Sequence, residues 1–431
     1  MADSARSDHP AVQQQLDRLT ALSPGGDRLG LERITALLDR LGRPQDRLPP
    51  VFHIAGTNGK GSTCAFLRAA LEAAGHRVHA FTSPHLVRFN ERIRLAGKLI
   101  EDDLLAALLS EALDASTGIE PSFFEVSAAA ALLAFSRVPA DALVLEVGMG
   151  GRLDATNVVK QPAVCGIAAL GMDHQQWLGS TLTAIAGEKA GIAKRGVPLV
   201  TDGYQRHVAA RVAEVAEAAG ATVLARGDAW DATVQGDQIA YHDSQGELLL
   251  PLPRLPGHHQ AINAALSMAM LRHQDKVAVP DRALSAAMGW ADWPARMQRL
   301  AAGPLTGDRE VWLDGAHNAN AARTLASTAQ QVFGDRLFNL IFASLRTKAP
   351  EAMLSAFAGL PASVHTVPIP HHDCFAPDEL ASLATRLGFP SAAHNDVPSA
   401  LAALPPEQPT LIMGSLYLAG EVLRLNDQAP D

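Results

Sequence analysis

The feature that most constrains this chain is a glycine-rich loop set between an apolar run and an amphipathic stretch. Residues 51–55 have the composition of a buried strand, 56–62 read Gly-Thr-Asn-Gly-Lys-Gly-Ser, and 63–74 have the periodicity of a helix ended by Gly75. Glycines let a backbone turn so that several N–H groups point one way, and a helix N-terminus adds positive potential. The segment therefore predicts a strand–loop–helix unit that binds a phosphate-type anion.

The same alternation of short apolar runs and amphipathic stretches continues along most of the chain. We expect further strands at 78–82, 142–147, 164–169 and 197–200, and helices at 122–135, 181–193, 207–219 and 260–271. Such alternation predicts a parallel sheet with helices on both faces. Short alternating pieces around the turn at 243–246 predict a small antiparallel addition.

A second domain is expected after the hinge-like segment 290–294. The alternation restarts there, with strands at 311–313, 337–343, 364–367 and 410–413 and helices at 319–333, 378–387 and 416–425. The predicted fold class is α/β: a P-loop-type parallel-sheet domain over 1–294, followed by a smaller Rossmann-like α/β domain over 295–431.

Composition and charge exclude several classes of protein. Of 431 residues, 48% are hydrophobic and 19% charged, which is typical of globular domains. The net charge of −9 argues against binding to nucleic acid, which needs a basic surface. Charged residues interrupt the most apolar stretch, 123–149, which argues against a membrane span. Three cysteines without metal spacing, and an N-terminus without an apolar signal region, favour a cytoplasmic protein.

Lys60 and Ser62 are the residues of the loop that suit a nucleotide and its metal ion. The lysine could reach the outer phosphates, and the hydroxyl could bind magnesium. The strict Walker pattern fails, because Ile54 stands six residues before Lys60 and Gly61 intervenes before Ser62. The alternative interpretation is a glycine-rich turn with a solvated lysine. Only seven lysines occur in the chain, so a lysine in this setting carries extra weight.

Three other predicted strands also end in polar or glycine-rich segments: 83–85, 146–154 and 173–174. Because the carboxyl ends of parallel strands meet at one edge of a sheet, these segments should lie near the loop. The Glu146 carboxylate could hold magnesium, whereas His174 is a soft ligand for that ion. Taken singly, each residue is as typical of an ordinary turn or a solvent-facing side chain.

Three further motifs lie later in the chain. Glu188-Lys189 stands late in a predicted helix, where the residues alone favour a solvated helix face. Asp314-Gly-Ala-His317 follows a predicted strand of the second domain, and Arg296 lies at the hinge, where an arginine could reach a phosphate.

Together these motifs resemble the folylpolyglutamate synthase/dihydrofolate synthase family of the Mur ligase superfamily. They run in family order over about 30–420: 56–62, 83–86, 90–93, 146–157, 173–174, 188–192, 314–318 and 414–417. The shortened phosphate loop is the family's own variant. The resemblance makes 1–294 an ATP- and pterin-binding domain and 295–431 a glutamate-ligase domain.

The resemblance implies an enzyme that uses ATP and magnesium, with two metal ions expected. The ATP phosphates would be bound by Gly56, Thr57, Asn58, Gly59, Lys60, Gly61 and Ser62. The metal ligands would be Ser83, Glu146 and His174, and Lys189 would be the lysine that the family carbamylates. Asn263, Arg296 and Asp314 would complete the ATP site, with His317 near the amino-acid end. Lys60, Lys189, His317 and Arg296 would be the catalytic residues.

The substrates implied are dihydropteroate, reduced folates and L-glutamate, joined through an acyl phosphate with release of ADP. The pterin would be held by Arg28, Leu29, Gly30, Leu31, Ser122, Phe123, Phe124, Glu125, Leu153, Asp154 and Ala155. We expect a cytoplasmic monomer without nucleic-acid or membrane partners. The chain departs from the family pattern at 345–349, where many members carry an acidic Asp-Lys-Asp-like stretch, and at 370–374.

Three other functions are compatible with parts of this pattern. Another amino-acid ligase of the Mur superfamily would share the ATP chemistry, although 29–33 and 123–125 favour a pterin. A GTP-binding switch protein would use the same loop type, but the sequence has no Asn-Lys-x-Asp guanine motif. A non-catalytic nucleotide-binding module would leave the motif at 314–318 unexplained.

Overall fold

The computed structural model describes residues 5–22 and 29–431. The chain divides into two units, one made of residues up to 254 with 260–292 and Asp431, the other of 255–259 with 293–430. The division after Asp292 lies close to the boundary expected after Pro294. The segment 255–259 clusters with the second unit.

The first unit is built on an eight-stranded sheet in the order β4-β3-β2-β5-β1-β6-β7-β8. The strands are β1 Val51–Ala55, β2 Val78–Phe81, β3 Ile93–Leu95, β4 Lys98–Leu99, β5 Ala142–Glu146, β6 Val164–Ile167, β7 Pro198–Thr201 and β8 Thr222–Ala225. All neighbouring pairs along β2-β5-β1-β6-β7-β8 are parallel. At one edge of the sheet, β3 and β4 are added in antiparallel pairing. β1 lies between β5 and β6, which puts its carboxyl end at the middle of the sheet edge.

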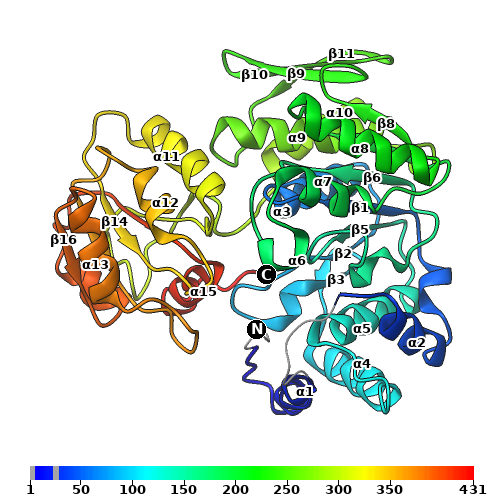
Figure 1. The fold of residues 1–431 in the computed structure, drawn as a ribbon, viewed down its shortest axis with the longest axis horizontal. Coiled ribbons are helices and arrows are strands. Elements are labelled where there is room, and N and C mark those ends of the chain that lie inside the picture. The colour runs from blue at the N-terminus through cyan, green and yellow to red at the C-terminus, as the bar shows by residue number, and fades with distance from the viewer. Residues whose placement is uncertain (1–4, 23–28) are drawn as a thin grey trace. The chain divides into compact units, whose positions relative to one another are not determined.

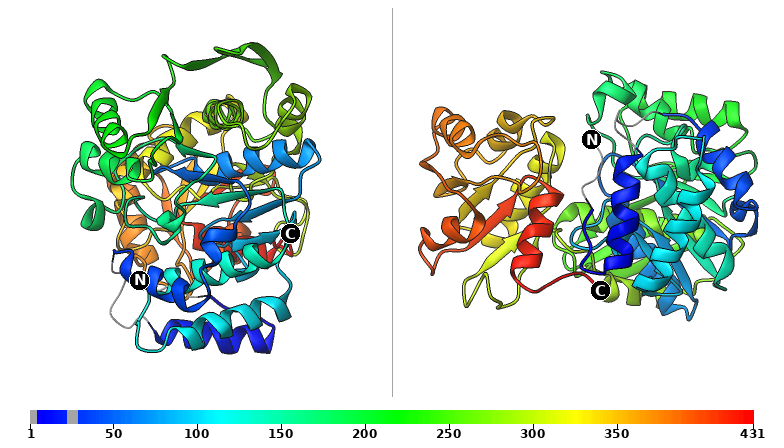
Figure 2. Two further views of the ribbon diagram at one scale, coloured as in Figure 1. Left: turned by 90° about the vertical axis from the view of Figure 1, so that its right-hand side faces the viewer. Right: turned by 90° about the horizontal axis from the view of Figure 1, so that it is seen from below.

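Helices cover both faces of this sheet (Figure 1). They are α1 Pro10–Ala21, α2 Glu32–Arg40, α3 Lys60–Ala73, α4 Asp102–Ala115, α5 Phe123–Arg137, α6 Gln175–Leu178, α7 Leu182–Ala190, α8 Arg206–Ala219, α9 His258–Arg272 and α10 Asp281–Trp290. α1 runs beside α4 in the outer layer (Figure 2), and both join α2 and α5 in one apolar core with Phe81 and Leu145. α5 is buried from Val126 to Phe135, which explains why its sequence carries no polar stripe.

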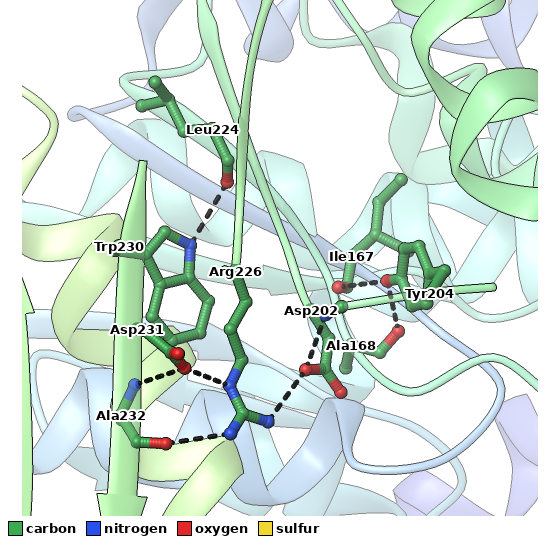
Figure 3. Close-up of polar contacts among 10 residues, drawn as sticks. Ile167, Ala168, Asp202, Tyr204, Leu224, Arg226, Trp230, Asp231 and Ala232 are labelled. Atoms are coloured by element: carbon green, nitrogen blue, oxygen red, sulfur yellow. Dashed lines mark hydrogen bonds and ion pairs between the residues drawn. The ribbon is translucent and has the colours of Figure 1, made fainter. Parts of the chain in front are cut away.

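The antiparallel addition forms a three-stranded sheet of β9 Trp230–Gln235, β10 Gln238–Asp243 and β11 Gly246–Pro251. Figure 3 shows how Arg226, just after β8, ties this sheet to the large one. Its guanidinium pairs with Asp231 at 2.9 Å and with Asp202 at 3.4 Å, and donates to the Ala232 carbonyl at 2.8 Å. The addition is thereby attached to the ends of β7 and β8.

A buried ion pair anchors the far side of the addition. Arg272 at the end of α9 donates to both Asp243 oxygens, at 2.7 and 2.9 Å, and the Tyr241 hydroxyl donates to the same carboxylate at 2.9 Å. The side chains of Asp243 and Arg272 are 0% and 9% exposed, so neither charge has bulk water as an alternative partner.

The second unit has a six-stranded sheet in the order β12-β13-β17-β14-β15-β16, parallel except for β12. The strands are β12 Gln298–Arg299, β13 Val311–Leu313, β14 Asn339–Phe342, β15 Ser363–Thr366, β16 Ser391–Ala393 and β17 Thr410–Met413. The helices are α11 Ala319–Phe333, α12 Pro350–Ser355, α13 Pro377–Arg386, α14 Val397–Ala402 and α15 Leu416–Leu425. The predicted α/β fold class, with two parallel-sheet domains, is confirmed.

The structure also bears on the expectations about a membrane span and about the cysteines. Throughout 5–22 and 29–431, no helix combines the length and the apolar character that crossing a bilayer requires. The cysteines are free thiols, with Cys64 and Cys165 buried and Cys374 partly exposed.

We predict that Asp243→Ala destabilises the protein by about 3–5 kcal/mol, because it leaves the Arg272 guanidinium buried without its carboxylate. Urea unfolding followed by circular dichroism would measure this. Asp281→Ala is the matched control, because Asp281 also pairs with Arg272, at 3.3 Å, but is 64% exposed. The control should change stability by less than about 1 kcal/mol. Equal effects of the two variants would contradict the prediction.

Candidate active site

The loop after β1 has the geometry of an anion-binding helix terminus. Gly59 has φ of +82°, which turns the chain directly into α3 at Lys60, three residues earlier than the sequence pattern indicated. The first intrahelical bond runs from Thr63 N–H to the Gly59 carbonyl at 2.9 Å. The N–H groups of residues 60–62 therefore point out of the helix end, where they can bind phosphate oxygens.

The segment after β6 holds this loop in place. The Ala169 carbonyl accepts hydrogen bonds from Thr57 N–H at 2.9 Å and Asn58 N–H at 3.1 Å. The Thr57 hydroxyl donates to the Gly171 carbonyl at 3.0 Å. On the other side, the Tyr204 hydroxyl lies 2.7 Å from the Ile167 carbonyl and 2.8 Å from that of Ala168 (Figure 3). The end of β6 is thus fixed between Tyr204 and the phosphate loop.

Asn263, expected at the nucleotide site, lies against the loop. If residue 59 had a Cβ, the Asn263 side-chain oxygen would be its nearest neighbour and would clash with it. Asn263 is buried on α9, where its amide donates to Gln260 at 3.1 Å. The structure therefore brings together the loop and Asn263, which lie about 200 residues apart.

Two lysines meet at one backbone carbonyl of the loop. Lys60 Nζ donates to the Gly56 oxygen at 3.1 Å, and Lys189 Nζ donates to the same oxygen at 2.9 Å. Lys189 is only 4% exposed, so the interpretation of Glu188-Lys189 as a solvated helix face is wrong for the lysine. Burial, and then the positive charge of Lys60, lower the pKa of Lys189 to about 7.

Residues 146–157 pack closely on the helix that carries Lys189. A Cβ at Gly151 would lie 2.7 Å from the Glu188 carbonyl and 2.8 Å from that of Lys189. Arg152 N–H donates to the Glu188 carbonyl at 2.8 Å, and the Asn157 amide donates to the Gly191 carbonyl at 3.1 Å. Gly151 is thus required because two backbone segments approach each other closely there.

Glu146 and Ser83 meet at neighbouring strand ends. Glu146 ends β5 and is 4% exposed, and its Oε2 accepts a hydrogen bond from Ser83 N–H at 3.1 Å. Carboxylate and hydroxyl oxygens suit a hard cation, so this donor set fits magnesium. His174 is exposed and precedes the short helix α6. No group of three or more His, Cys, Asp or Glu residues in 5–22 and 29–431 is placed to hold a metal, and the ligand set stays a prediction.

The segments expected to hold a pterin meet in the first unit. The ring of Phe124 fills the space that a Cβ at Gly148 would need, so 122–125 lie against the loop 148–154. A capping box begins α5: Ser122 Oγ accepts from Glu125 N–H at 3.2 Å, and Glu125 accepts from Ser122 N–H at 2.7 Å. Glu125 also pairs with Arg33 at 3.0 Å.

Apolar contacts join the rest of this group. Leu31, Phe123, Phe124 and Ala155 belong to the same core cluster or pack on it. Gly30 lies beside the Glu32 carboxylate, and Leu153 is partly exposed. Arg28 lies outside the described residues. The pterin contacts of the whole set stay a prediction.

In the second unit, Asp314 organises the segment around Arg296. One Asp314 oxygen accepts from Met297 N–H and the other from Ala316 N–H, both at 2.8 Å. Ala295 and Met297 have φ of +56° and +44°, a strained conformation for residues with side chains. Burial raises the pKa of Asp314, which Arg296 opposes. The carboxylate therefore stabilises a backbone that presents Arg296.

His317 is also partly exposed in this unit, with its Nδ1 at 2.9 Å from the Gly315 carbonyl. A Cβ at Gly315 would lie 2.9 Å from Arg296 Nη1, so the motif 314–317 and Arg296 are neighbours. Their roles toward ATP and glutamate stay predictions.

Sequence reasoning missed three residues that shape the site: Tyr204, Thr156 and His53. His53 and Tyr204 lie in a strand and a loop that no motif marks, and Thr156 lies inside the motif 146–157 but is not singled out there. Only the fold shows that their polar atoms support the glycine-rich loops.

Comparisons with known proteins agree on one family. The Mur ligase middle domain model matches residues 54–271, and the model of the dihydrofolate synthetase C-terminal domain matches 304–425. The dihydrofolate synthase/folylpolyglutamate synthase of Bacillus subtilis is 36% identical over 79% of this chain and 81% of its own.

Solved structures are similar over nearly the whole chain. Escherichia coli FolC in complex with DHPP and ADP has a TM-score of 0.87 at 30% identity, covering 96% of this chain and 97% of that one. The Yersinia pestis bifunctional folylpolyglutamate synthase/dihydrofolate synthase, complexed with AMPPNP and Mn ion, has a TM-score of 0.85 at 28% identity, covering 98% and 99%.

We predict that folding stability rises with pH above about 7 because of Lys189. Its pKa falls from 10.5 in the unfolded chain to about 7 in the folded one, so between these values only the unfolded chain holds the proton. The contribution of Lys189 to stability must then rise with pH in that window. The measurement is made below about pH 9, because above it the raised pKa values of the buried Cys64 and Cys165 thiols act in the opposite direction. Urea unfolding in carbonate-free, metal-free buffer would show the rise in the wild type and a flatter profile for Lys189→Met. The exposed-lysine variant Lys276→Met should keep the wild-type profile; a Lys189→Met profile as steep as the wild type would contradict the prediction.

Proposed function

The chain belongs to the dihydrofolate synthase/folylpolyglutamate synthase family of the Mur ligases, and from this premise we propose how its residues perform the reaction. It is an ATP-dependent ligase that joins L-glutamate to dihydropteroate and to reduced folates, with ADP and phosphate as products. The observation that carries the assignment of the reaction centre is the meeting of the phosphate loop, Glu146 and the buried Lys189 at one sheet edge.

The chemical task is to join a carboxylate to an amine in water. A carboxylate resists attack, so ATP first phosphorylates it and gives an acyl phosphate. The neutral amine of glutamate then attacks the carbonyl carbon, and phosphate leaves from the tetrahedral intermediate. Negative charge spreads over the transferring phosphoryl group, so catalysis depends on positive groups placed there in advance.

This chain supplies those groups from the start of α3. The N–H groups of residues 60–62 bind and orient the phosphates, and Lys60 moves from the Gly56 carbonyl to the outer phosphates. Asn263, held against the loop by its contact at Gly59, lines the same site. Thr57 and Asn58 keep the loop on its support at Ala169.

Ser83, Glu146 and His174 would hold the magnesium. The ion supplies charge neutralisation for the phosphates when it is bound. The Ser83 N–H bond to Glu146 Oε2 orients the carboxylate, and carboxylate and hydroxyl oxygens are ligands that suit a hard cation.

Lys189 would act as a carbamate. Carbamylation needs a neutral amine, and a pKa near 7 provides one at physiological pH. The amine adds to the carbon of carbon dioxide and releases one proton to solvent, which gives a planar anion with two oxygens. This anion suits a hard cation and removes the repulsion between two neighbouring lysines. Lys60 then remains as the cation for the phosphates.

We assign Arg296, Asp314 and His317 to the second half of the reaction. Asp314 holds the strained backbone that presents Arg296, whose guanidinium would bind phosphate. His317 would lie near the incoming glutamate. In this proposal, 1–294 bind ATP and the pterin, and 295–431 handle glutamate. We also propose a monomer that works in the cytoplasm, which is consistent with three free cysteines.

The purified protein with ATP, magnesium and glutamate should release ADP only when dihydropteroate or a reduced folate is present. Mass spectrometry should show one glutamate added to each acid. We expect both acids to react, because the pterin-side motifs match the family while the departures lie elsewhere. AMP and pyrophosphate as products would reject the acyl-phosphate route. Activity on tetrahydrofolate alone would reject the bifunctional assignment.

Lys189→Ala should lower turnover by about 100-fold or more, because an anionic ligand that orients the metal and phosphates is lost, while an ATP analogue still binds. A short carboxylate such as acetate, added at high concentration, should restore part of the rate to Lys189→Ala and none to Lys60→Ala. Wild-type turnover of Lys189→Ala would reject the carbamate.

A further inference from the structure

A chain of three buried polar side chains links the phosphate-loop strand to the glycine loop after β5. His53 lies in the middle of β1, Thr156 in the short helical turn Ala155–Val158, and Asp154 caps that turn. His53 Nε2 lies 2.9 Å from the Thr156 hydroxyl, which lies 2.5 Å from Asp154 Oδ1. Exposure is 0% for His53 and Thr156 and 4% for Asp154, so water does not replace these bonds.

The direction of the protons follows from the partners. Asp154 Oδ1 can only accept, so the threonine hydroxyl donates to it and must itself accept from His53 Nε2–H. His53 Nδ1 then carries a lone pair, which agrees with its having no hydrogen-bond partner in the described structure. Burial and the charge of Lys194 lower the pKa of His53 to about 3, so the ring stays neutral, and its bond to the Thr156 hydroxyl selects this tautomer.

The Asp154 carboxylate is fully used by the protein itself. Oδ1 accepts from the Thr156 hydroxyl and from Thr156 N–H at 3.0 Å, and Oδ2 accepts from Met149 N–H at 2.8 Å. Gly148 N–H also bonds the carboxylate. A carboxylate offers about four acceptor positions, so none is left for a bound ligand.

The Asp154 carboxylate holds the loop after β5, and other residues of the candidate site pack on this loop. Gly148 lies under the ring of Phe124, and Gly151 lies on the backbone of Glu188 and Lys189. A shift of the loop would move the surface beside Phe124 first, because the Asp154 carboxylate bonds the N–H groups of Gly148 and Met149 directly.

We propose that His53, Thr156 and Asp154 form a positioning relay that holds residues 148–153 in the shape that receives the pteroate part of the substrate. Asp154 does not contact that substrate through its carboxylate, and His53 acts without touching it. This inference rests on the proposed function, since it assigns the relay to the substrate of that reaction. The competing explanation is that the relay only stabilises the fold.

A threonine-to-valine change separates the two explanations. Thr156→Val keeps the shape of the side chain and removes its hydroxyl, so it should raise the KM for dihydropteroate about tenfold while the KM for ATP changes less than about twofold. Thr156→Ser restores the hydroxyl and should return the KM toward the wild-type value. The matched control is Thr328→Val, which removes an equally buried hydroxyl that donates only to its own helix at 3.0 Å.

Histidine variants test the other end of the relay. His53→Gln keeps an N–H donor near the hydroxyl and should retain a KM closer to the wild type than His53→Leu, which has none. Thermal unfolding of every variant records stability separately. The proposal is overturned if Thr156→Val lowers only the melting temperature, or if it raises both KM values alike. A wild-type enzyme inactive with every pteroate acid would instead reject the proposed function.

Discussion

The carbonyl oxygen of Gly56 is the point on which the rest of the site depends, because two ammonium groups meet there. One neutral oxygen cannot balance two charges, and the buried surroundings weaken solvation of either. The protein resolves the conflict by lowering the pKa of Lys189, so that one lysine loses its charge near neutral pH. In the proposed reaction, Lys60 would bind phosphate, and the neutral amine of Lys189 would react with carbon dioxide.

Glycines make this arrangement possible by letting three loops approach closely. Gly59 admits Asn263, Gly148 admits the ring of Phe124, and Gly151 admits the backbone at 188–189. A Cβ at any of these positions would lie closer to its neighbour than such atoms approach in proteins, so one of the two parts would have to shift. The segments proposed to bind the nucleotide and the pterin, and the helix that carries Lys189, therefore pack closely on these glycines. Through such packing, the proposed relay would act on a substrate that it does not contact.

The sequence predicts the strands and helices well, because buried parallel strands read as apolar runs and the glycine loops mark their ends. It also predicts the edge where the site lies, since carboxyl ends of parallel strands must meet. It does not predict the burial of Lys189, because a neighbouring Glu-Lys pair is typical of a solvated helix face. The burial follows from the packing of Gly151 on the backbone of 188–189, which only the fold shows. His53 leaves no local signal, because its contact with Thr156 joins residues 103 positions apart in the chain.

The two segments that depart from the family pattern are one structural feature. Leu345 and Cys374 pair as an isolated antiparallel bridge, and Arg346 N–H donates to the Asp373 carbonyl at 3.2 Å. The Arg346 guanidinium lies over Phe375 and pairs with Glu379 at 3.0 Å. A basic residue stands in a stretch where many members are acidic, and acidic partners at 373 and 379 complement it. His372 of the second segment stacks on Tyr417 at 3.9 Å, in the motif after β17. The two departing segments therefore form one loop pair held by their own contacts, and the strand-end motifs of this unit remain in place.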